Sequence, residues 1–195
     1  MLSRHVLAGV IAICMMPALP LFGAESVHTT DPDTGIESWE IHTQNVSLRL
    51  TQILPDQVRG FYSARGFDAE SVELLATGAC VFQTIFRNES AKRAIEFNLA
   101  DWRVLTAKGE QPLRLERDWQ QEWAKRRVSA SARTAFRFAL YPTEHRYEIG
   151  DWNMGMTTYA LPLGSRFDLR FVWRENGKRR EAVLYGVRCA EETTK

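Results

Sequence analysis

Apolar and polar residues alternate along most of this chain, which is the pattern of half-buried β-strands. From Cys80 to Phe86 every second residue falls on one side of a strand, and the other side also carries apolar residues. Two further alternating runs lie near the C-terminal end: Phe167, Leu169, Phe171 and Trp173, and then Val183, Tyr185, Val187 and Cys189. The chain is therefore predicted to be mostly β.

Shorter runs predict further strands with interruptions. The alternating residues Trp39 and Ile41, and then Val46, Leu48 and Leu50, indicate a broken first strand. Ile95, Phe97 and Leu99 alternate in one phase and Trp102 and Val104 in the other, so a β-bulge near Ala100 or Asp101 is expected. One more strand is predicted from Phe136, Phe138 and Leu140.

Two segments carry helical spacing instead. Pro55 opens the first helix, which Gly66 can end in a left-handed conformation. Asp68 is a favourable N-cap for the next helix, which ends near Gly78. Residues 55–78 are thus predicted as a helical insertion that covers another part of the molecule and is not itself a core. A short charged helix is predicted over 118–126.

The last two strands are predicted to form a hairpin around Asn176-Gly177. A two-residue turn there leaves Val183 and Tyr185 on the face that carries arginines. A three-residue loop instead pairs Phe171 with Val183 and Leu169 with Tyr185. We expect the second register, because a one-residue slip exposes a whole row of large side chains.

Several short strands joined by turns are typical of two packed antiparallel sheets. The predicted fold is a mostly β, antiparallel immunoglobulin-like β-sandwich with short helical insertions at 55–78 and 118–126, and a small closed barrel is the alternative. No Pro/Ser/Gly-rich linker divides residues 36–195, which are long enough to bury their own core, so a single domain is expected.

The N-terminal segment has the composition of a secretory signal peptide. Arg4 precedes an apolar run from Val6 to Met16, and small residues, Gly23-Ala24, follow. Residues 1–24 are therefore predicted to be removed on export, and the polar residues 25–35 to form a flexible leader. The predicted location is the periplasm or the outside of the cell.

Net charge and hydropathy argue against two classes of partner, nucleic acids and the interior of a membrane. The chain has 25 basic and 24 acidic side chains, and the signal peptide holds one arginine and no acid, so the mature chain carries no net charge. Nothing in this balance favours nucleic acid. The apolar run near the N-terminus is shorter than the roughly 20 residues that a membrane-spanning helix needs, so no integral membrane segment is expected after cleavage.

Removal of the predicted signal peptide takes away Cys14. The two remaining cysteines, Cys80 and Cys189, are then expected to lie in an oxidising compartment. Two cysteines in a secreted chain are expected to pair, although two separate buried thiols are the alternative. A disulfide here places the C-terminal strand beside the strand that begins at Cys80.

Sequence motifs do not indicate an enzyme. The chain has no Gly-x-Ser-x-Gly elbow, no His-Glu-x-x-His and no phosphate-binding glycine loop. The leading hypothesis is a non-catalytic accessory or binding protein without a cofactor, which acts through contacts with an unidentified periplasmic protein partner.

One segment suggests a metal ion as an alternative. His145, Trp152, Met154 and Met156 combine an imidazole, an indole and two thioethers. Thioether and imidazole ligands select Cu(I) or Ag(I), and an indole face adds attraction. In ligand chemistry this set resembles the His/Trp/Met-x-Met site of the small periplasmic copper and silver chaperones, with a Trp-to-Met spacing one residue shorter. The same residues also fit a sandwich core, where methionine fills gaps beside aromatic rings.

Trp119 and Trp123 are the remaining candidates for recognition. They lie four positions apart in a short charged helix that has little else apolar to bury. They are predicted either to line a surface for a protein partner or a glycan, or to serve as core anchors.

Overall fold

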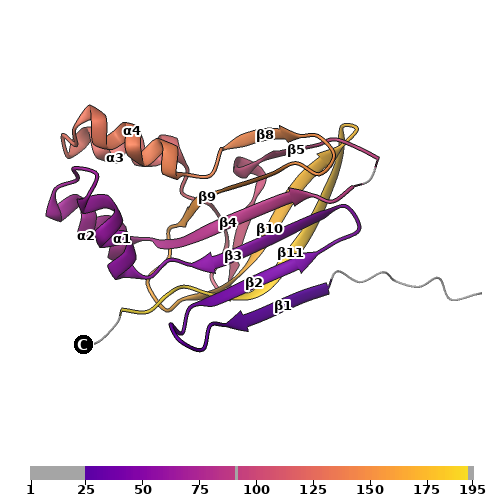
Figure 1. The fold of residues 1–195 in the computed structure, drawn as a ribbon, viewed down its shortest axis with the longest axis horizontal. Helices are drawn as coiled ribbons and strands as arrows, with labels where there is room; N and C mark the ends of the chain where they lie inside the picture. Colours follow the sequence, from indigo (N-terminus) through magenta and orange to yellow (C-terminus); the bar gives the residue numbers. More distant parts are fainter. Residues whose placement is uncertain (1–24, 91, 193–195) are drawn as a thin grey trace, which may run out of the picture.

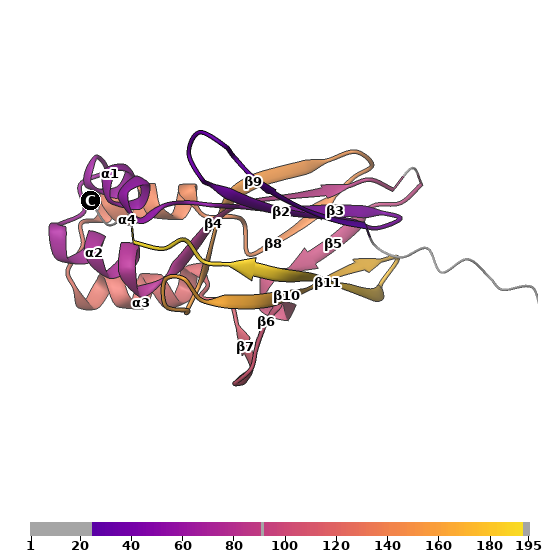
Figure 2. The same cartoon turned by 90° about the horizontal axis from the view of Figure 1, so that it is seen from below.

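The computed structural model describes residues 25–90 and 92–192, and it confirms a mostly β protein. Strands hold 45% of the described residues and helices 25%, and the strands form two antiparallel sheets, consistent with a β-sandwich. Figure 1 shows the helices gathered beyond one end of the strands, and Figure 2 shows the two sheets in side view, one above the other.

The first sheet has the strand order β1-β2-β3-β4-β9. The strands are β1 (Glu25–Thr30), β2 (Glu37–His42), β3 (Val46–Gln52), β4 (Cys80–Asn88) and β9 (Trp152–Tyr159). Alternate residues of the central strands are buried, so this sheet has one face on the core and one outer face. The predicted broken strand over Trp39 to Leu50 is in fact the antiparallel pair β2 and β3.

The second sheet is centred on β10. One edge of β10 (Arg166–Glu175) pairs with β5 (Ile95–Asn98) and β6 (Arg103–Thr106), and the opposite edge pairs with β11 (Lys178–Arg188). Outside these strands, β8 (Glu144–Tyr147) pairs with β5, and β7 (Gly109–Pro112) pairs with β6. A short 3-10 turn, Leu99–Asp101, separates β5 from β6 where a bulge is predicted.

Four helices form a layer at one end of the sandwich. The helices are α1 (Pro55–Ser63), α2 (Ala69–Gly78), α3 (Glu116–Lys125) and α4 (Ala130–Ala139). The Asp68 side chain accepts a hydrogen bond from the Ser71 backbone N–H at 2.9 Å, and Gly66 has a φ of +81°, so the predicted cap and stop are both confirmed. The helical insertion predicted for residues 55–78 is therefore confirmed as the two helices α1 and α2.

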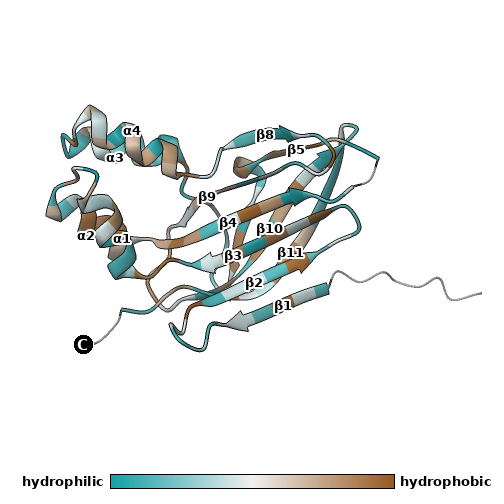
Figure 3. Ribbon diagram, viewed as in Figure 1, coloured by the Kyte–Doolittle hydropathy of each residue, from teal (hydrophilic) through white to brown (hydrophobic). Residues whose placement is uncertain are grey.

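Two hydrophobic cores fill the molecule. One lies between the sheets, and the other is formed by the four helices together with residues near the start of β4. Figure 3 shows hydrophobic residues along the central strands and on the helices, whereas β1 is largely hydrophilic. The prediction that residues 55–78 do not form a core is therefore wrong.

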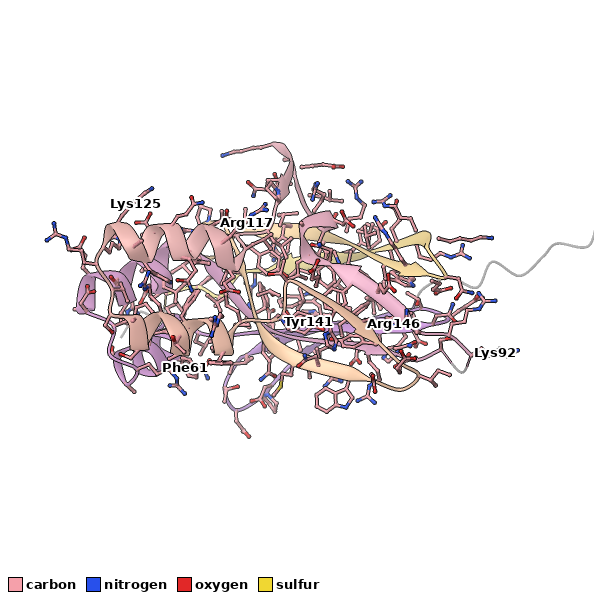
Figure 4. All side chains as sticks on the ribbon, turned by 90° about the horizontal axis from the view of Figure 1, so that it is seen from above. Phe61, Lys92, Arg117, Lys125, Tyr141 and Arg146 are labelled. Atoms are coloured by element: carbon pink, nitrogen blue, oxygen red, sulfur yellow. A yellow bond between two sulfur atoms is a disulfide. The ribbon has the colours of Figure 1, made fainter. Side chains whose placement is uncertain are left out.

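A close crossing joins the helices to the sandwich. The chain leaves α4 and passes β9, where the Tyr141 backbone N–H donates to the Met156 carbonyl oxygen at 2.8 Å. A Cβ atom at Gly155 would lie 2.6 Å from the Tyr141 nitrogen, so this position requires glycine. Figure 4 labels Tyr141 at this junction.

The disulfide between Cys80 and Cys189 is confirmed, with a Cα–Cα distance of 5.4 Å. It connects the start of β4 to the segment just after β11, across 109 positions of sequence. The C-terminal strand is thereby held beside the first sheet at the end of the sandwich that carries the helices (Figure 1).

The predicted strand over Phe136 to Leu140 is wrong, because this segment belongs to α4 and its C-cap. Ser129 caps the helix, Phe136 is buried in the helical core, and Phe138 is exposed. Three alternating apolar residues are too few to separate a period of 2 from a period of 3.6.

The predicted register of the C-terminal hairpin is also wrong. The turn has two residues, Asn176 and Gly177, both with positive φ, which a type I′ turn requires. Tyr185 is therefore exposed, and the register shifts near Gly186, whose φ is +68°. This irregularity returns Val187 to the core, so the cost of the short register is limited to one exposed tyrosine.

The flexible leader predicted for residues 25–35 is only partly a loop. Residues 25–30 form β1, which pairs with all six residues of β2. The His28 ring stacks on Trp39 with a centroid distance of 4.8 Å, a contact that a polar sequence does not reveal. The predicted signal peptide, residues 1–24, lies outside the described residues.

Among residues 25–90 and 92–192, the helices are too short or too polar to cross a membrane.

Candidate functional site

A groove lies between the two sheets at the end of the sandwich that faces away from the helices. We call it the inter-sheet groove, and its volume is about 540 Å³. It runs between β1, the β2–β3 turn and the β10–β11 hairpin. Its lining residues are Glu25, His42, Thr43, Gln44, Asn45, Trp173, Glu175, Arg180, Glu181 and Ala182.

Glu175 is the unusual residue of this groove. It ends β10 on the same face as Phe171 and Trp173, and only 2% of its surface is exposed. Its Oε1 atom accepts hydrogen bonds from Asn45 Nδ2 and from Trp173 Nε1, both at 2.9 Å. The Oε2 atom is buried and has no hydrogen-bond partner among the described residues.

Two guanidinium groups stand near Oε2 without bonding to it. Arg93 Nη1 lies 3.8 Å away and Arg180 Nε lies 3.9 Å away, beyond the usual 2.7–2.9 Å of a charge-assisted hydrogen bond. Both arginine side chains are about half exposed. A buried acceptor without a hydrogen bond costs about 1–3 kcal/mol. A ligand that donates a hydrogen bond to Glu175 Oε2 would remove this cost.

The rim of the groove also carries charge. Its lining holds three carboxylates, those of Glu25, Glu175 and Glu181, and the guanidinium of Arg180. Two further guanidinium groups lie close by: Arg179 Nη1 is 2.7 Å from Glu181 Oε2, and Arg93 Nη1 is 3.8 Å from Glu175 Oε2. His42, on the same rim, lies 3.1 Å from Glu40 Oε1 and 3.4 Å from Glu89 Oε2. The Oε2 atom of Glu175, which has no hydrogen bond among the described residues, therefore suits the groove to a ligand that donates a hydrogen bond to a carboxylate.

A second buried glutamate provides an internal comparison. Glu37, at the start of β2, is 8% exposed and lies at the end of the strands nearer the helices. Its Oε2 atom accepts hydrogen bonds from Arg188 Nε at 2.9 Å and from Gln52 Nε2 at 3.2 Å, and His28 Nε2 lies 3.4 Å from Oε1. The hydrogen bond to Glu37 raises the pKa of Arg188. Oε2 of Glu37 thus has two hydrogen bonds from the chain itself, and Oε1 has an imidazole nitrogen beside it.

The residues of the predicted metal site lie on two different sheets, with Trp152, Met154 and Met156 on β9 and His145 on β8. Trp152 and Met154 are 50% and 49% exposed on the outer face of β9, and Met156 is half-buried on the same face. The Met156 sulfur already accepts a hydrogen bond from the Tyr62 hydroxyl at 3.3 Å.

His145 is not brought to that face. It shares its side of β8 with buried Tyr147, and the two rings are 5.0 Å apart. Burial raises the pKa of the Tyr147 hydroxyl to about 12. In residues 25–90 and 92–192, no three His, Cys, Asp or Glu side chains are close enough together to hold a metal ion.

Trp119 and Trp123 do not form a partner surface. Both are fully buried and stacked on each other, with ring centroids 4.9 Å apart, in the helical core. Trp119 Nε1 donates to Thr158 Oγ1 at 2.7 Å, and the Arg114 guanidinium covers the Trp119 ring at 3.5 Å. The predicted helix is correct and the predicted exposure is wrong, because α1, α2 and α4 supply the apolar surface that the sequence of α3 lacks.

The groove residues were not singled out by the sequence, although one signal exists. Glu175 continues the alternation of Phe171 and Trp173, so an acid stands on an apolar strand face. Asn45 and Arg93 come from other parts of the chain, Arg180 follows across the hairpin turn, and none of the three carries a comparable signal.

No protein-family model, curated protein or solved structure was found that matches this chain, so the site is argued from its own geometry.

Proposed function

We propose that this chain is an exported, non-catalytic binding protein that recognises another polypeptide at the inter-sheet groove. The observation that supports this most directly is the position of β11, which lines the groove and, among the described residues, pairs only with β10. An unpaired strand edge beside a groove is a recurring site for extended peptides. The backbone of the added strand supplies affinity, and the groove supplies specificity.

The register identifies the free edge. In a hairpin with a two-residue turn, Glu175 and Lys178 form the first hydrogen-bonded pair, and every second pair along the strands repeats it. Arg180 and Ala182 therefore bond to β10. The backbone groups of the residues between and beside them, Arg179, Glu181 and Val183, point away from β10.

Val183→Pro tests this proposal, because proline removes an outward N–H that β10 does not use. The matched control is Val183→Ala, which shortens the side chain and keeps the N–H. A panel of blocked, Val/Thr-rich hexapeptides that differ in one charged residue serves as the probe. We expect some of these peptides to bind the native chain and the alanine variant but not the proline variant.

Hydrogen exchange reports where such peptides bind. Peptide binding should slow exchange of the backbone amides of Arg179, Glu181 and Val183. Unchanged exchange at all three positions, or equal binding by the proline and alanine variants, would contradict the proposal. Thermal unfolding of both variants shows whether the hairpin itself is intact.

Export is part of the same proposal. The disulfide between two buried cysteines supports it, because such bridges persist in oxidising compartments. We expect the mature chain to begin at Glu25. Mass spectrometry of the native protein would detect this N-terminus, and an intact chain in the cytoplasm would contradict it.

The alternative function is a carrier of Cu(I) or Ag(I). It is supported by Met154, which offers a half-exposed thioether beside Trp152 and on the same face as Met156. Titration with Cu(I) against a competing chelator tests it. A carrier should bind one ion tightly and lose it in the Met154→Ala, Met156→Ala variant, whereas His145→Ala should have little effect because His145 lies on the other face.

Within the sandwich class, immunoglobulin-like topology stays a prediction. The first sheet places β1, β2, β3 and β4 side by side in chain order. The proposed function uses only the edge of β11 and the groove, so it does not depend on this assignment.

A further inference from the structure

We propose that Glu175 recognises a basic side chain, lysine or arginine, of the polypeptide ligand, and that Arg180 gives up its place beside Glu175 when the ligand binds. This inference rests on the proposed function, because it names the chemistry that the inter-sheet groove selects. The observation behind it is that the Glu175 side chain is only 2% exposed, while its Oε2 atom accepts no hydrogen bond from the described residues.

The two oxygens of Glu175 have different roles. A carboxylate oxygen accepts about two hydrogen bonds, and Oε1 already has two, from Asn45 and Trp173. These bonds fix the carboxylate in one orientation. Oε2 keeps its capacity, because it has no hydrogen bond among the described residues.

Arg180 and Arg93 lie beside Oε2 but do not donate hydrogen bonds to it. Each lies nearly 4 Å away and is about half exposed, so either guanidinium can move into water when another cation takes its place beside the buried carboxylate. Arg180 extends from β11, the strand that the ligand is proposed to pair with, and it lines the groove. A ligand cation that bonds directly to Oε2 would take the position that Arg180 occupies loosely.

The rest of the lining favours an organic cation over a metal ion. Glu181 is already paired with Arg179 at 2.7 Å, and the described residues offer no cluster of three ligating His, Cys, Asp or Glu side chains. Trp173 and Ala182 contribute the apolar part of the lining, against which the hydrocarbon stem of lysine or arginine can pack.

The experiment compares blocked hexapeptides that carry one central arginine, lysine or citrulline in a Val/Thr sequence. Citrulline has nearly the shape of arginine without its charge. The probe signal is the indole N–H of Trp173 in NMR spectra, because this group donates to Glu175 and reports directly on the site. The signal is assigned with Trp173→Phe.

We expect the arginine or lysine peptide to bind about tenfold more tightly than the citrulline peptide at low salt, which corresponds to one charge-assisted contact. Glu175→Gln should abolish this preference, since glutamine keeps the acceptor for Asn45 and Trp173 but loses the charge. Arg180→Gln should tighten binding of the basic peptide severalfold by removing the competitor.

Two matched variants serve as controls. Glu181→Gln removes a carboxylate from the exposed rim and should weaken binding only slightly. Glu37→Gln changes a buried glutamate whose oxygens already have partners, and it should leave the preference for the basic peptide unchanged.

The outcomes separate this inference from the proposed function. If all three peptides bind equally and protect the amides of β11, the groove binds polypeptide but Glu175 does not select charge, and this inference is wrong. The same holds if Arg180→Gln weakens binding, or if the preference survives Glu175→Gln. If no peptide binds and the amides of β11 exchange as before, both proposals fail.

Discussion

Glu37 and Glu175 occupy comparable positions at opposite ends of the sandwich, yet their carboxylates differ in the hydrogen bonds that they accept. Each is a glutamate buried between the sheets on the side of β11. Glu37 receives hydrogen bonds from Arg188 and Gln52, whereas Glu175 keeps one oxygen without any hydrogen bond among the described residues.

The two surroundings explain the difference. Arg188 is followed directly by Cys189, whose disulfide fixes this end of β11 to β4, so the partners of Glu37 are held in place. At the other end, the hairpin tip and the β2–β3 turn leave the inter-sheet groove open. A buried carboxylate that its own chain satisfies is structural, and one left half satisfied beside a groove is a candidate for recognition.

The largest expected effect comes from cutting the disulfide. Replacing both Cys80 and Cys189 with alanine should lower the free energy of unfolding by about 4–5 kcal/mol, the chain-entropy value for a loop of this length. Urea denaturation measures it. A loss below about 1 kcal/mol would show that the end near Glu37 is closed without the bridge.

Glu37→Gln should have the next largest effect. It removes the charge that Arg188 pairs with and places an amide donor beside the donors of Gln52, so we expect a loss of about 1–3 kcal/mol. Thermal and urea unfolding measure the change. Stability equal to that of the native chain would contradict the structural role assigned to Glu37.

Glu175→Gln should change the free energy of unfolding by less than about 1 kcal/mol, because the bonds from Asn45 and Trp173 can remain and Oε2 has no bond to lose. The comparison with Glu37→Gln under identical conditions is the measurement. A larger loss for Glu175→Gln than for Glu37→Gln would reverse the assignment of the two glutamates.

The smallest effect is expected from Arg180→Gln. Arg180 is half exposed and lies 3.9 Å from the buried carboxylate of Glu175, and Arg93 stays beside that carboxylate at 3.8 Å, so stability should change by less than about 0.5 kcal/mol. Arg93→Gln, at the similar distance of 3.8 Å, is the matched variant. A loss above 1 kcal/mol for either would show that the arginine satisfies Oε2 in solution.

Long periodic runs were easier to predict than short ones in this chain. The run from Cys80 alternates over enough residues to identify β4, whereas Phe136 to Leu140 offers three apolar residues that fit either period. The hairpin shows a third case. Its turn residues were identified correctly, but the register depended on whether the fold tolerates an exposed Tyr185 and an irregularity at Gly186.

The functional residues depended even more on the fold. Trp119 and Trp123 have the spacing of an exposed aromatic pair, but burial of an indole is decided by what other segments place over it. Met154 and Met156 lie on one face of β9, while His145 lies on a strand of the other sheet.

The sequence by itself determined the alternation that makes the protein mostly β, the caps of α2, and the pair of cysteines, because these depend on neighbouring residues or on simple counting. Only the tertiary structure decided which glutamate is satisfied. Asn45, Arg93, Glu175 and Arg180 come from three separate parts of the chain, and the few ångströms between their side chains are fixed by the packing of two sheets, which no local pattern records.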